Sequence, residues 1–435
     1  MTDKQPIAIF WFRRDLRIFD NPALFHALTS GLKVLPVFIF DKNILDKLYK
    51  DDKRVHFIFQ AIENLNILLK PYKSAIKLFY GNPKEIFGEI LLDYNIRMVF
   101  ANHDYEPYAI ARDMGIEKFL KEKGIGFQTF KDQVVFEKND ITKVSGEPYT
   151  VFTPYSKKWL EKLYQDKNYL YNWNSEDYLH NFIEAENNNS IQLSDIVFSG
   201  DSLVFEKFQI NRTILSHYGD TRDFPALDTT SKAGIHLRFG TISIRQLVAS
   251  ALEINPVWLN ELIWREFFMQ ILFHFPHVQD HPFKPKYQFI KWINNENDFE
   301  AWKNGLTGYP LVDAGMRELN ETGFMHNRVR MVTSSFLIKH LLVNWQWGEA
   351  YFAEKLLDFD LSANNGNWQW AAGTGCDAAP YFRIFNPTTQ AEKFDKENIY
   401  ISKWVPEYAS SNYCRPIIEH SFARNRCLEA YKASL

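Results

Sequence analysis

The chain has 435 residues, of which 46% are hydrophobic, 24% are charged and 16% are aromatic, and its formal net charge is −3. This length and composition predict a globular protein of two or three domains and exclude a disordered or fibrous one. The charge excludes a generally basic nucleic-acid coat, so any DNA binding must come from a local patch. No run approaches the ~18 apolar residues of a membrane span and the first residues lack a signal-peptide pattern, so we expect a soluble, cytoplasmic protein.

The number and positions of the cysteines and tryptophans are informative. Cys376, Cys414 and Cys427 are odd in number and widely spaced. This indicates reduced thiols, with neither a disulfide framework nor a zinc site, and we expect no metal. Nine of the twelve tryptophans lie at or beyond Trp258, so the second half of the chain differs chemically from the first.

The first 130 residues alternate strand-like runs with helical patterns. Continuous apolar runs of strand length occur at 6–12, 33–40, 76–81 and 97–103. Segments between them, such as 55–69, carry apolar residues at helical spacing. The alternation predicts an α/β domain, a doubly wound parallel sheet whose ligands bind beyond the carboxyl ends of the strands. No Gly-x-Gly-x-x-Gly follows the first run, so we expect no standard dinucleotide site there.

A linker and an all-α domain follow. Residues 168–202 have an Asn cluster, weak periodicity and few core-forming stretches. From about Leu203 helical patterning dominates, interrupted by Gly and Pro. We therefore predict an α/β domain over 1–135, an interdomain linker over 136–202 and an α-helical catalytic domain over 203–435.

Thr230, Ser231, Lys232, Ala233 and Gly234 form a short run of hydroxyls, small residues and a cation before a helical pattern. Such a run can hold a pyrophosphate group through backbone N–H groups. A plain helix cap has the same composition, so both interpretations stay open at this point.

Residues 257–275 predict a long helix by period and length. Glu261, Trp264, Arg265 and Phe268 stand at i, i+3, i+4 and i+7 and share one face. A Glu–Arg pair on a solvated face is the ordinary interpretation, because an unpaired buried carboxylate is costly. The bulky aromatic neighbours favour a pocket wall instead.

Residues 322–331 (TGFMHNRVRM) place Asn327, Arg328 and Met331 within one helical turn. An Asn amide and an Arg suit a phosphate or a base edge, and a Met suits soft contact with a flat ring. Alone, the pattern is also that of the start of a surface helix.

Residues 358–390 are the most informative stretch. They crowd carboxylates, amides, tryptophans, a Gly-Thr-Gly and an Arg into a segment without a long apolar run. Small residues and amides between aromatics predict a concave site that a flat ligand approaches closely. The competing interpretation is a Gly-rich loop between two core helices.

These motifs resemble those of the photolyase/cryptochrome family, and most closely its bacterial class I enzymes, which repair cyclobutane pyrimidine dimers. The segment at 257–275 looks like the family's Trp-x-x-Glu-x-x-Trp-Arg-Glu-Phe helix, and 358–390 looks like its flavin and substrate pocket. WFRRDLRIFDNPAL at 11–24 and YEPYAIARD at 105–113 are similar to its antenna-binding domain. The resemblance therefore runs nearly end to end.

The resemblance implies a light-driven carbon–carbon lyase that acts on DNA containing pyrimidine dimers. It implies that Glu261 hydrogen-bonds the lesion carbonyls, in a protonation state that the sequence leaves open. Asn327 stands where enzymes for (6-4) photoproducts carry a His, and Met331 where cryptochromes that prefer single strands usually carry a Gln; both differences favour dimer repair. The implied catalytic residues are Glu261, Trp264, Asn327, Met331 and Trp370, and the implied DNA contacts are Arg222, Glu261, Trp264, Arg265, Phe268, Asn327, Arg328 and Gln390.

The resemblance also implies non-covalent FAD in the α-helical domain. Asn364 would face flavin atom N5, and Arg330 would compensate the charge of Asp358. The family usually has Thr-Ser-Arg-Leu-Ser at 230–234, from which this chain departs at its last three residues. The implied FAD contacts are Tyr218, Thr230, Ser231, Lys232, Ala233, Gly234, Trp258, Arg330, Asp358, Phe359, Asp360 and Asn364.

Trp292, Trp345 and Trp368 match the tryptophans that carry electrons from the surface to the flavin in the family, although packing is the usual role of any single Trp. A second, antenna chromophore is expected, either deazaflavin or methenyltetrahydrofolate. Tyr108 and Ala109 replace the amide and Glu of folate-using relatives, which disfavours folate. An empty antenna pocket also stays open.

Two other functions compete with dimer repair. A cryptochrome-type blue-light photoreceptor would use the same FAD and tryptophans for signalling, and usually carries a longer C-terminal tail. A dark flavin reductase would need a hydride-donor site, and the sequence carries no nicotinamide fingerprint. We expect a monomer that does not bind membranes.

Overall fold

The computed structural model describes residues 4–184, 191–196, 198–199 and 204–434. The chain divides into two compact units. The first contains Met1–Glu137, Glu161–Gln209 and Ala233–Glu253, and the second contains Lys138–Leu160, Ile210–Lys232 and Ile254–Leu435. Each unit thus combines three separate segments of the chain, and the domain boundaries proposed at 135 and 202 stay predictions.

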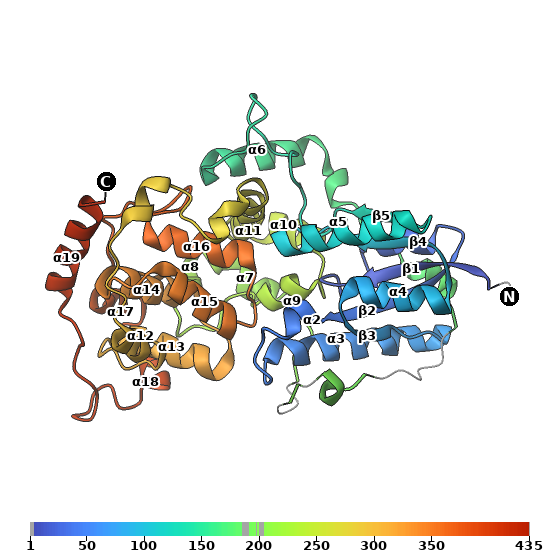
Figure 1. Ribbon diagram of the computed structural model, residues 1–435. Coiled ribbons are helices and arrows are strands. Elements are labelled where there is room, and N and C mark those ends of the chain that lie inside the picture. Colours follow the sequence, from blue (N-terminus) through green and yellow to red (C-terminus); the bar gives the residue numbers. More distant parts are fainter. Residues whose placement is uncertain (1–3, 185–190, 197, 200–203, 435) are drawn as a thin grey trace. The chain divides into compact units, whose positions relative to one another are not determined.

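Five parallel strands form the sheet of the first unit, in the order β3-β2-β1-β4-β5 (Figure 1). They are β1 (Pro6–Phe12), β2 (Lys33–Asp41), β3 (Lys77–Gly81), β4 (Asn95–Asn102) and β5 (Gly126–Phe130). The four predicted apolar runs are the first four strands. The sequence prediction missed β5 because this edge strand, GFQTF, is only partly buried and has no continuous apolar run.

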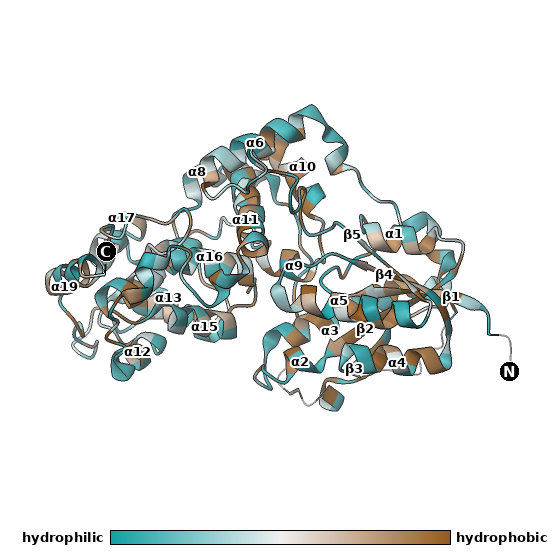
Figure 2. Cartoon of the chain, turned by 45° about the horizontal axis from the view of Figure 1, so that its top comes forward, coloured by the Kyte–Doolittle hydropathy of each residue, from teal (hydrophilic) through white to brown (hydrophobic). Residues whose placement is uncertain are grey.

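Helices cover both faces of this sheet. Phe10 and Phe12 of β1 belong to the apolar cluster that includes α1 (Pro22–Leu28) and α3 (Lys53–Leu69). Alternate residues of a strand point to opposite faces, and Ile9 and Trp11 accordingly join the cluster with α4 (Pro83–Asp93) and α5 (Pro107–Glu122). Much of β1 and β4 is brown in Figure 2, as expected for strands buried on both sides. The predicted doubly wound α/β fold is confirmed. The remaining helices of this unit are α2 (Lys42–Leu45), α9 (Gly234–Phe239) and α10 (Ile244–Ile254).

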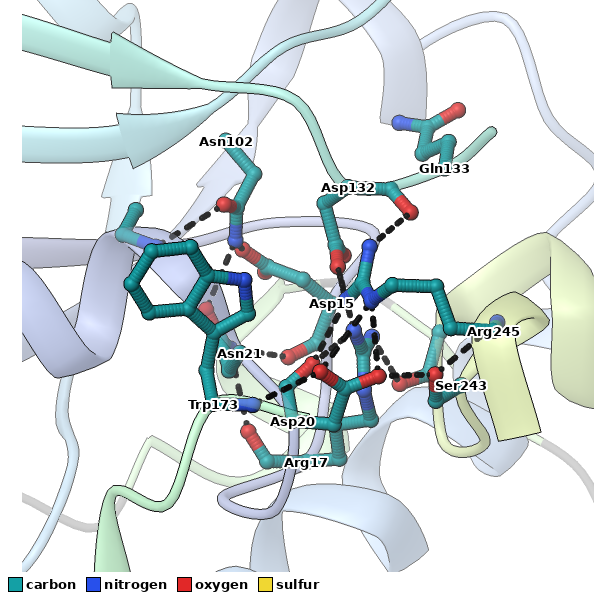
Figure 3. A network of polar contacts seen from close by, with 12 residues as sticks. Asp15, Arg17, Asp20, Asn21, Asn102, Asp132, Gln133, Trp173, Ser243 and Arg245 are labelled. Carbon is teal, nitrogen blue, oxygen red and sulfur yellow. Dashed lines mark hydrogen bonds and ion pairs between the residues drawn. The ribbon is translucent and has the colours of Figure 1, made fainter. Parts of the chain in front are cut away.

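A buried polar network ties the segment after β1 to α10 within the first unit (Figure 3). Arg245 bonds Asp20 and Asp132 at 2.8 Å each, and Arg17 also pairs with Asp132. Burial alone would raise the pKa of Asp132, but Arg17 and Arg245 together lower it below its usual value. Removing one partner of such a pair typically costs about 3–5 kcal/mol, so much of the motif WFRRDLRIFDNPAL serves the fold of this unit.

The second unit is built from helices (Figure 1). They are α7 (Arg212–Ser216), α8 (Tyr218–Thr221), α11 (Pro256–His274), α12 (Glu296–Lys303), α13 (Pro310–Thr322), α14 (Asn327–Ser335), α15 (Trp345–Lys355), α16 (Leu361–Ala372), α17 (Pro387–Phe394), α18 (Ile399–Trp404) and α19 (His420–Lys432). Helix α6 (Phe152–Gln165) crosses the boundary between the units. Within the described residues, every helix is too short or too polar to cross a lipid bilayer.

Helix α11 confirms the helix predicted at 257–275. It begins with Pro256, and the side chain of Asn255 caps it by accepting a hydrogen bond from the Val257 N–H. Its buried residues lie around most of its circumference. Glu266, which is 2% exposed, accepts a hydrogen bond from the Trp159 indole at 2.6 Å and holds this helix in the core.

Gly366 allows α16 to approach α11 closely. A Cβ atom at this position would lie 2.1 Å from Cδ1 of Phe268. We therefore expect Gly366→Ala to lower the free energy of unfolding by about 1–3 kcal/mol through overpacking.

Gly88 in α4 is the control for this prediction, because a Cβ there meets nothing within 4 Å. Gly88→Ala should raise stability by about 0.5–1 kcal/mol, as Ala normally does in a helix. Denaturant unfolding of both variants checks the comparison, and equal effects would contradict it.

Candidate functional site

Helices α14, α15 and α16 and the segment before α16 line a partly open cavity of about 90 Å³. It is lined by Asn327, Arg330, Met331, Ser334, Phe352, Leu356, Asp358, Phe359, Asp360, Ala363, Asn364, Asn367, Trp368, Trp370 and Ala371. The structure thus brings together three groups of predicted residues, namely flavin contacts, lesion contacts and one tryptophan of the electron chain.

Arg330 and Asp358 form an ion pair in this cavity. Nη2 of Arg330 lies 2.9 Å from Oδ2 of Asp358, as expected from the sequence. Oδ1 of Asp358 is buried and accepts no hydrogen bond from any described residue. Leaving a buried acceptor without a donor costs about 1–3 kcal/mol. A flavin, which carries an imide N–H and ribityl hydroxyls, fits this orphaned oxygen.

The beginning of α16 fixes two more predicted flavin contacts. Asp360 caps the helix by accepting from the Ser362 and Ala363 N–H groups, so its carboxylate also has a structural role that the sequence prediction missed. Nδ2 of Asn364 donates to Oε1 of Glu349 at 2.9 Å and to its carbonyl oxygen at 3.1 Å. Both bonds use the amide nitrogen, which leaves the amide oxygen for a ligand donor.

Glu349 on α15 was missed by the sequence prediction. Burial raises the pKa of its carboxyl to about 7, although the Asn364 hydrogen bond opposes the shift. Its position in WQWGEAYF was the one available signal, a carboxyl on an aromatic-rich helix. Glu349 orients the amide that is predicted to face the flavin.

We expect Asp358→Ala to lose FAD on gel filtration, because Arg330 then keeps its charge without a partner and the ligand loses an acceptor. Wild-type protein should retain stoichiometric, non-covalent FAD. Glu300→Ala is the control, since Glu300 pairs with Lys303 on α12 at 2.6 Å and does not line the cavity. Flavin absorbance per chain measures retention, and full retention in Asp358→Ala would contradict the prediction.

Glu261 on α11 pairs with Arg222, just after α8. Nη1 of Arg222 lies 2.5 Å from Oε1 of Glu261, and the two side chains are 23% and 30% exposed. The sequence left a pair between Glu261 and Arg265, one turn along the same helix, as the alternative to a pocket wall. The structure instead gives Glu261 a partner from another element, the same arginine that is predicted to contact DNA.

Trp264 lies one turn beyond Glu261 and stacks on Phe152. The ring centroids are 3.6 Å apart and the rings are nearly parallel, at 6°. Phe152 begins α6, and the sequence gave no signal that it would reach α11. It covers one face of the indole that is predicted to hold the lesion.

Two further predicted DNA contacts lie on α14 and α17, and their surroundings differ. Nη2 of Arg328 bonds Oδ1 of Asp223 at 2.8 Å, and its guanidinium lies 4.3 Å from the ring centroid of Phe394. The Gln390 side-chain oxygen is buried and has no hydrogen-bond donor among the described residues. These contacts leave the predicted roles in DNA binding untested.

Other predicted contacts lie outside the cavity lining. Phe268 is 6% exposed and packs against Gly366, and Trp258 is 2% exposed. The guanidinium carbon of Arg222 lies 5.5 Å from the ring centroid of Tyr218. Burial raises the pKa of the Tyr218 hydroxyl to about 12. Their roles in binding FAD or DNA stay predictions.

The run at 230–234 precedes a helix, as predicted. Lys232 is exposed and pairs with Asp228 at 2.7 Å, and Gly234 is the first residue of α9. Ala233 and Gly234 belong to the first unit, whereas Thr230, Ser231 and Lys232 belong to the second. Contacts of this run to a pyrophosphate group stay predictions.

The three predicted electron-transfer tryptophans meet in one apolar cluster of the second unit. Trp345 and Trp368 are 3% and 2% exposed, and the partly buried Trp292 packs against the same cluster. The sequence prediction did not single out Trp302, which is fully buried with its ring centroid 6.2 Å from that of Trp368. Only Trp368 of these lines the cavity.

Residues that bear on an antenna chromophore lie in the first unit. The Tyr108 hydroxyl donates to Oδ2 of Asp41 at 2.6 Å, and burial together with Asp41 raises its pKa to about 12. Ala109 is buried. The guanidinium groups of Arg13 and Arg112 lie 4.8 and 4.9 Å from the ring centroid of Trp11. These groups stand near the carboxyl ends of β1 and β2, where doubly wound sheets bind ligands.

Residues 258–412 match the model of the FAD binding domain of DNA photolyase, and residues 8–170 match the DNA photolyase model. The chain is 36% identical to the deoxyribodipyrimidine photo-lyase of Escherichia coli K12, over 98% of each protein. It belongs to the photolyase/cryptochrome family. FAD is therefore its cofactor, and the region that matches the FAD binding domain includes α14, α15 and α16, the helices that line the cavity.

Solved structures agree with this assignment. An archaeal photolyase from Sulfolobus tokodaii, described with two FAD molecules and the implication of a novel light-harvesting cofactor, is 34% identical with a TM-score of 0.84, covering 98% of this chain and 99% of its own. A cryptochrome from Synechocystis sp. PCC6803 is 25% identical with a TM-score of 0.85, covering 99% and 100%. Repair enzymes and a cryptochrome thus share this fold.

Proposed function

We propose that this family member repairs cyclobutane pyrimidine dimers in DNA by light-driven electron transfer. The observation that carries the proposal is the cavity, which joins predicted flavin contacts to predicted lesion contacts. The relative from Escherichia coli, whose name is deoxyribodipyrimidine photo-lyase, supports the same substrate class.

Three groups of side chains would hold FAD in the cavity. Asp358 accepts a donor at its orphaned Oδ1, with Arg330 compensating its charge. The amide oxygen of Asn364, oriented by Glu349, accepts a flavin N–H. Phe352, Leu356 and Trp368 give apolar walls that exclude water from the ring.

The reaction needs a dimer turned out of the DNA stack, which costs a few kcal/mol and less where the lesion already distorts the duplex. Met331 and Trp370 from the cavity, with Trp264, would hold the dimer by soft and stacking contacts. When bound and reduced, FAD supplies a light-excited electron that returns after the two cyclobutane carbon–carbon bonds have broken, so there is no net redox change. Glu261 would hydrogen-bond the pyrimidine on which negative charge develops.

The test is repair of a dimer-containing oligonucleotide by purified, reduced protein. We expect repair under blue or near-UV light and none in darkness. A photoreceptor would instead show light-dependent flavin chemistry without loss of dimers. A blue-light photoreceptor is the alternative function, because the fold is also similar to that of a cryptochrome.

We also propose that the first unit binds an antenna chromophore. Tyr108 and Ala109 disfavour a folate, so a deazaflavin or another flat flavin-like ring is favoured. The two FAD molecules described for the Sulfolobus tokodaii enzyme support a flavin-like ligand.

A further inference from the structure

The side chains of Arg222 and Glu261 form an ion pair in the structure. Their closest atoms, Nη1 and Oε1, are 2.5 Å apart. Under the proposed function the arginine contacts a DNA phosphate and the carboxyl contacts the lesion. A DNA phosphate and Glu261 would therefore compete for the same guanidinium when DNA binds.

The lesion places its own demand on Glu261. The edge of a pyrimidine ring in the dimer presents a carbonyl acceptor beside an imide N–H donor. An ionised carboxylate only accepts hydrogen bonds, whereas a protonated carboxyl both donates and accepts. The protonated form matches both atoms of that edge and avoids placing a negative charge beside the pyrimidine on which negative charge develops.

A DNA phosphate competes well for Arg222. Guanidinium groups bind phosphates bidentately, and each such contact also releases counterions from the DNA. Arg222 is partly exposed and its Nε lies 4.0 Å from Oδ1 of Asp223, which is already bonded to Arg328. Nothing in this arrangement covers the guanidinium completely.

The groups around Glu261 decide what happens when Arg222 leaves it. Tyr218 lies near it from α8, and burial raises the pKa of the tyrosine to about 12, which keeps it neutral. Asp223 lies beside Arg222, with Oδ1 4.0 Å from its Nε. Arg265 follows one turn along α11, and Arg328 pairs with Asp223. Helix α16, which also packs on α11, has no titratable side chain. Moving Arg222 to a phosphate therefore removes the cation nearest to Glu261.

We propose that Arg222 is shared between Glu261 and a DNA phosphate, so that binding of DNA transfers the arginine to the phosphate and Glu261 takes up a proton from solvent. This inference rests on the proposed function. It makes Arg222 a positioning residue that sets the protonation of the lesion-binding carboxyl. No electron moves in this step, and the proton remains on Glu261 until the DNA leaves.

The experiment is titration of reduced full-length protein with a dimer-containing oligonucleotide in darkness. Calorimetry in buffers of different ionisation enthalpy measures the protons taken up. We expect net uptake in the wild type and loss of that uptake in Glu261→Gln. At about pH 5, close to the ordinary range of a carboxyl, Arg222→Ala should take up less than the wild type, because Glu261 without its cation already carries part of the proton before DNA arrives. Asp223 could also take up a proton, because its partner Arg328 is predicted to move to a DNA phosphate. The difference in proton uptake between the wild type and Glu261→Gln gives the contribution of Glu261 alone.

Two further measurements sharpen the result. The bound state holds more protons, so wild-type affinity should fall as pH rises, by up to about tenfold per pH unit, while the affinity of Glu261→Gln should depend much less on pH. The infrared difference spectrum on binding should show a protonated-carboxyl band that Glu261→Gln lacks. Both readouts detect protonation itself, which a purely structural role would leave unchanged.

The outcomes separate the two proposals. Equal affinity for damaged and undamaged DNA would overturn the proposed function. Preference for damaged DNA with the same proton uptake in wild type and Glu261→Gln would overturn the inference alone. Uptake that depends on Glu261 but is unaffected by Arg222→Ala would show that the lesion, not the shared arginine, drives protonation, and would also overturn it.

Discussion

Replacement of Trp368 by Phe is expected to block photoreduction of oxidised FAD and to leave most of the repair by chemically reduced enzyme. Trp368 lines the cavity and shares an apolar cluster with Trp345 and Trp292. Indole gives up an electron far more readily than a benzene ring, so Phe interrupts electron supply. Phe keeps much of the volume, and the loss of packing should remain small compared with truncation to Ala.

Trp302→Phe is the matched control for this change. Trp302 is fully buried and close to Trp368, but it lies outside the predicted chain, and its Nε1 donates to the Thr333 carbonyl at 3.1 Å. We expect this variant to photoreduce nearly normally. The decay of oxidised-flavin absorbance under blue light, with an external reductant, measures both variants. Normal photoreduction in Trp368→Phe, or its loss in Trp302→Phe, would assign the proximal donor to another residue.

Glu261→Ala should lower the repair yield per photon several-fold and change lesion affinity much less. The carboxyl is proposed to act where charge develops, so its effect belongs to the chemical step. Quantum yield at saturating oligonucleotide separates this from binding. The variant also leaves Arg222 without its partner, which favours phosphate binding.

Arg328→Ala is the comparison, because its guanidinium is predicted to contact a phosphate. It should weaken binding across DNA sequences and reduce the slope of log affinity against log salt by about 1, with little change in yield. Affinity measured at several salt concentrations checks this. If Glu261→Ala loses only affinity and Arg328→Ala loses only yield, the assignments of α11 and α14 are reversed.

Local patterns were enough to predict most of the fold. The strands β1 to β4 are continuous apolar runs because both faces of the sheet are covered, and α11 has the period and length of a buried helix. The edge strand β5 has neither signal. The contribution of 233–253 to the first unit could not be predicted, since it depends on buried partners such as Asp20 and Asp132 far away in the chain.

The candidate site divides in the same way. Residues of the stretch 358–370 were found because they are contiguous and chemically unusual, and they line one cavity. Glu349, Phe152 and Trp302 were not found, because each matters through a contact to a residue from another helix. The pairing of Glu261 with Arg222 is the clearest case. Spacing along α11 offered only Arg265 as a partner for Glu261, whereas the observed partner comes from the segment after α8, which is distant in the sequence.

The network around Arg245 has a consequence for how the protein is made on the ribosome. Asp20 and Asp132 belong to the part of the chain that is synthesised first, but α10 supplies Arg245 and leaves the ribosome only after a segment of the other unit, 210–232, has been made. Until then the two carboxylates lack a cation that the finished structure buries with them. The nascent sheet therefore cannot reach its final stability from residues 1–137 alone, and has to wait until α10 has left the ribosome.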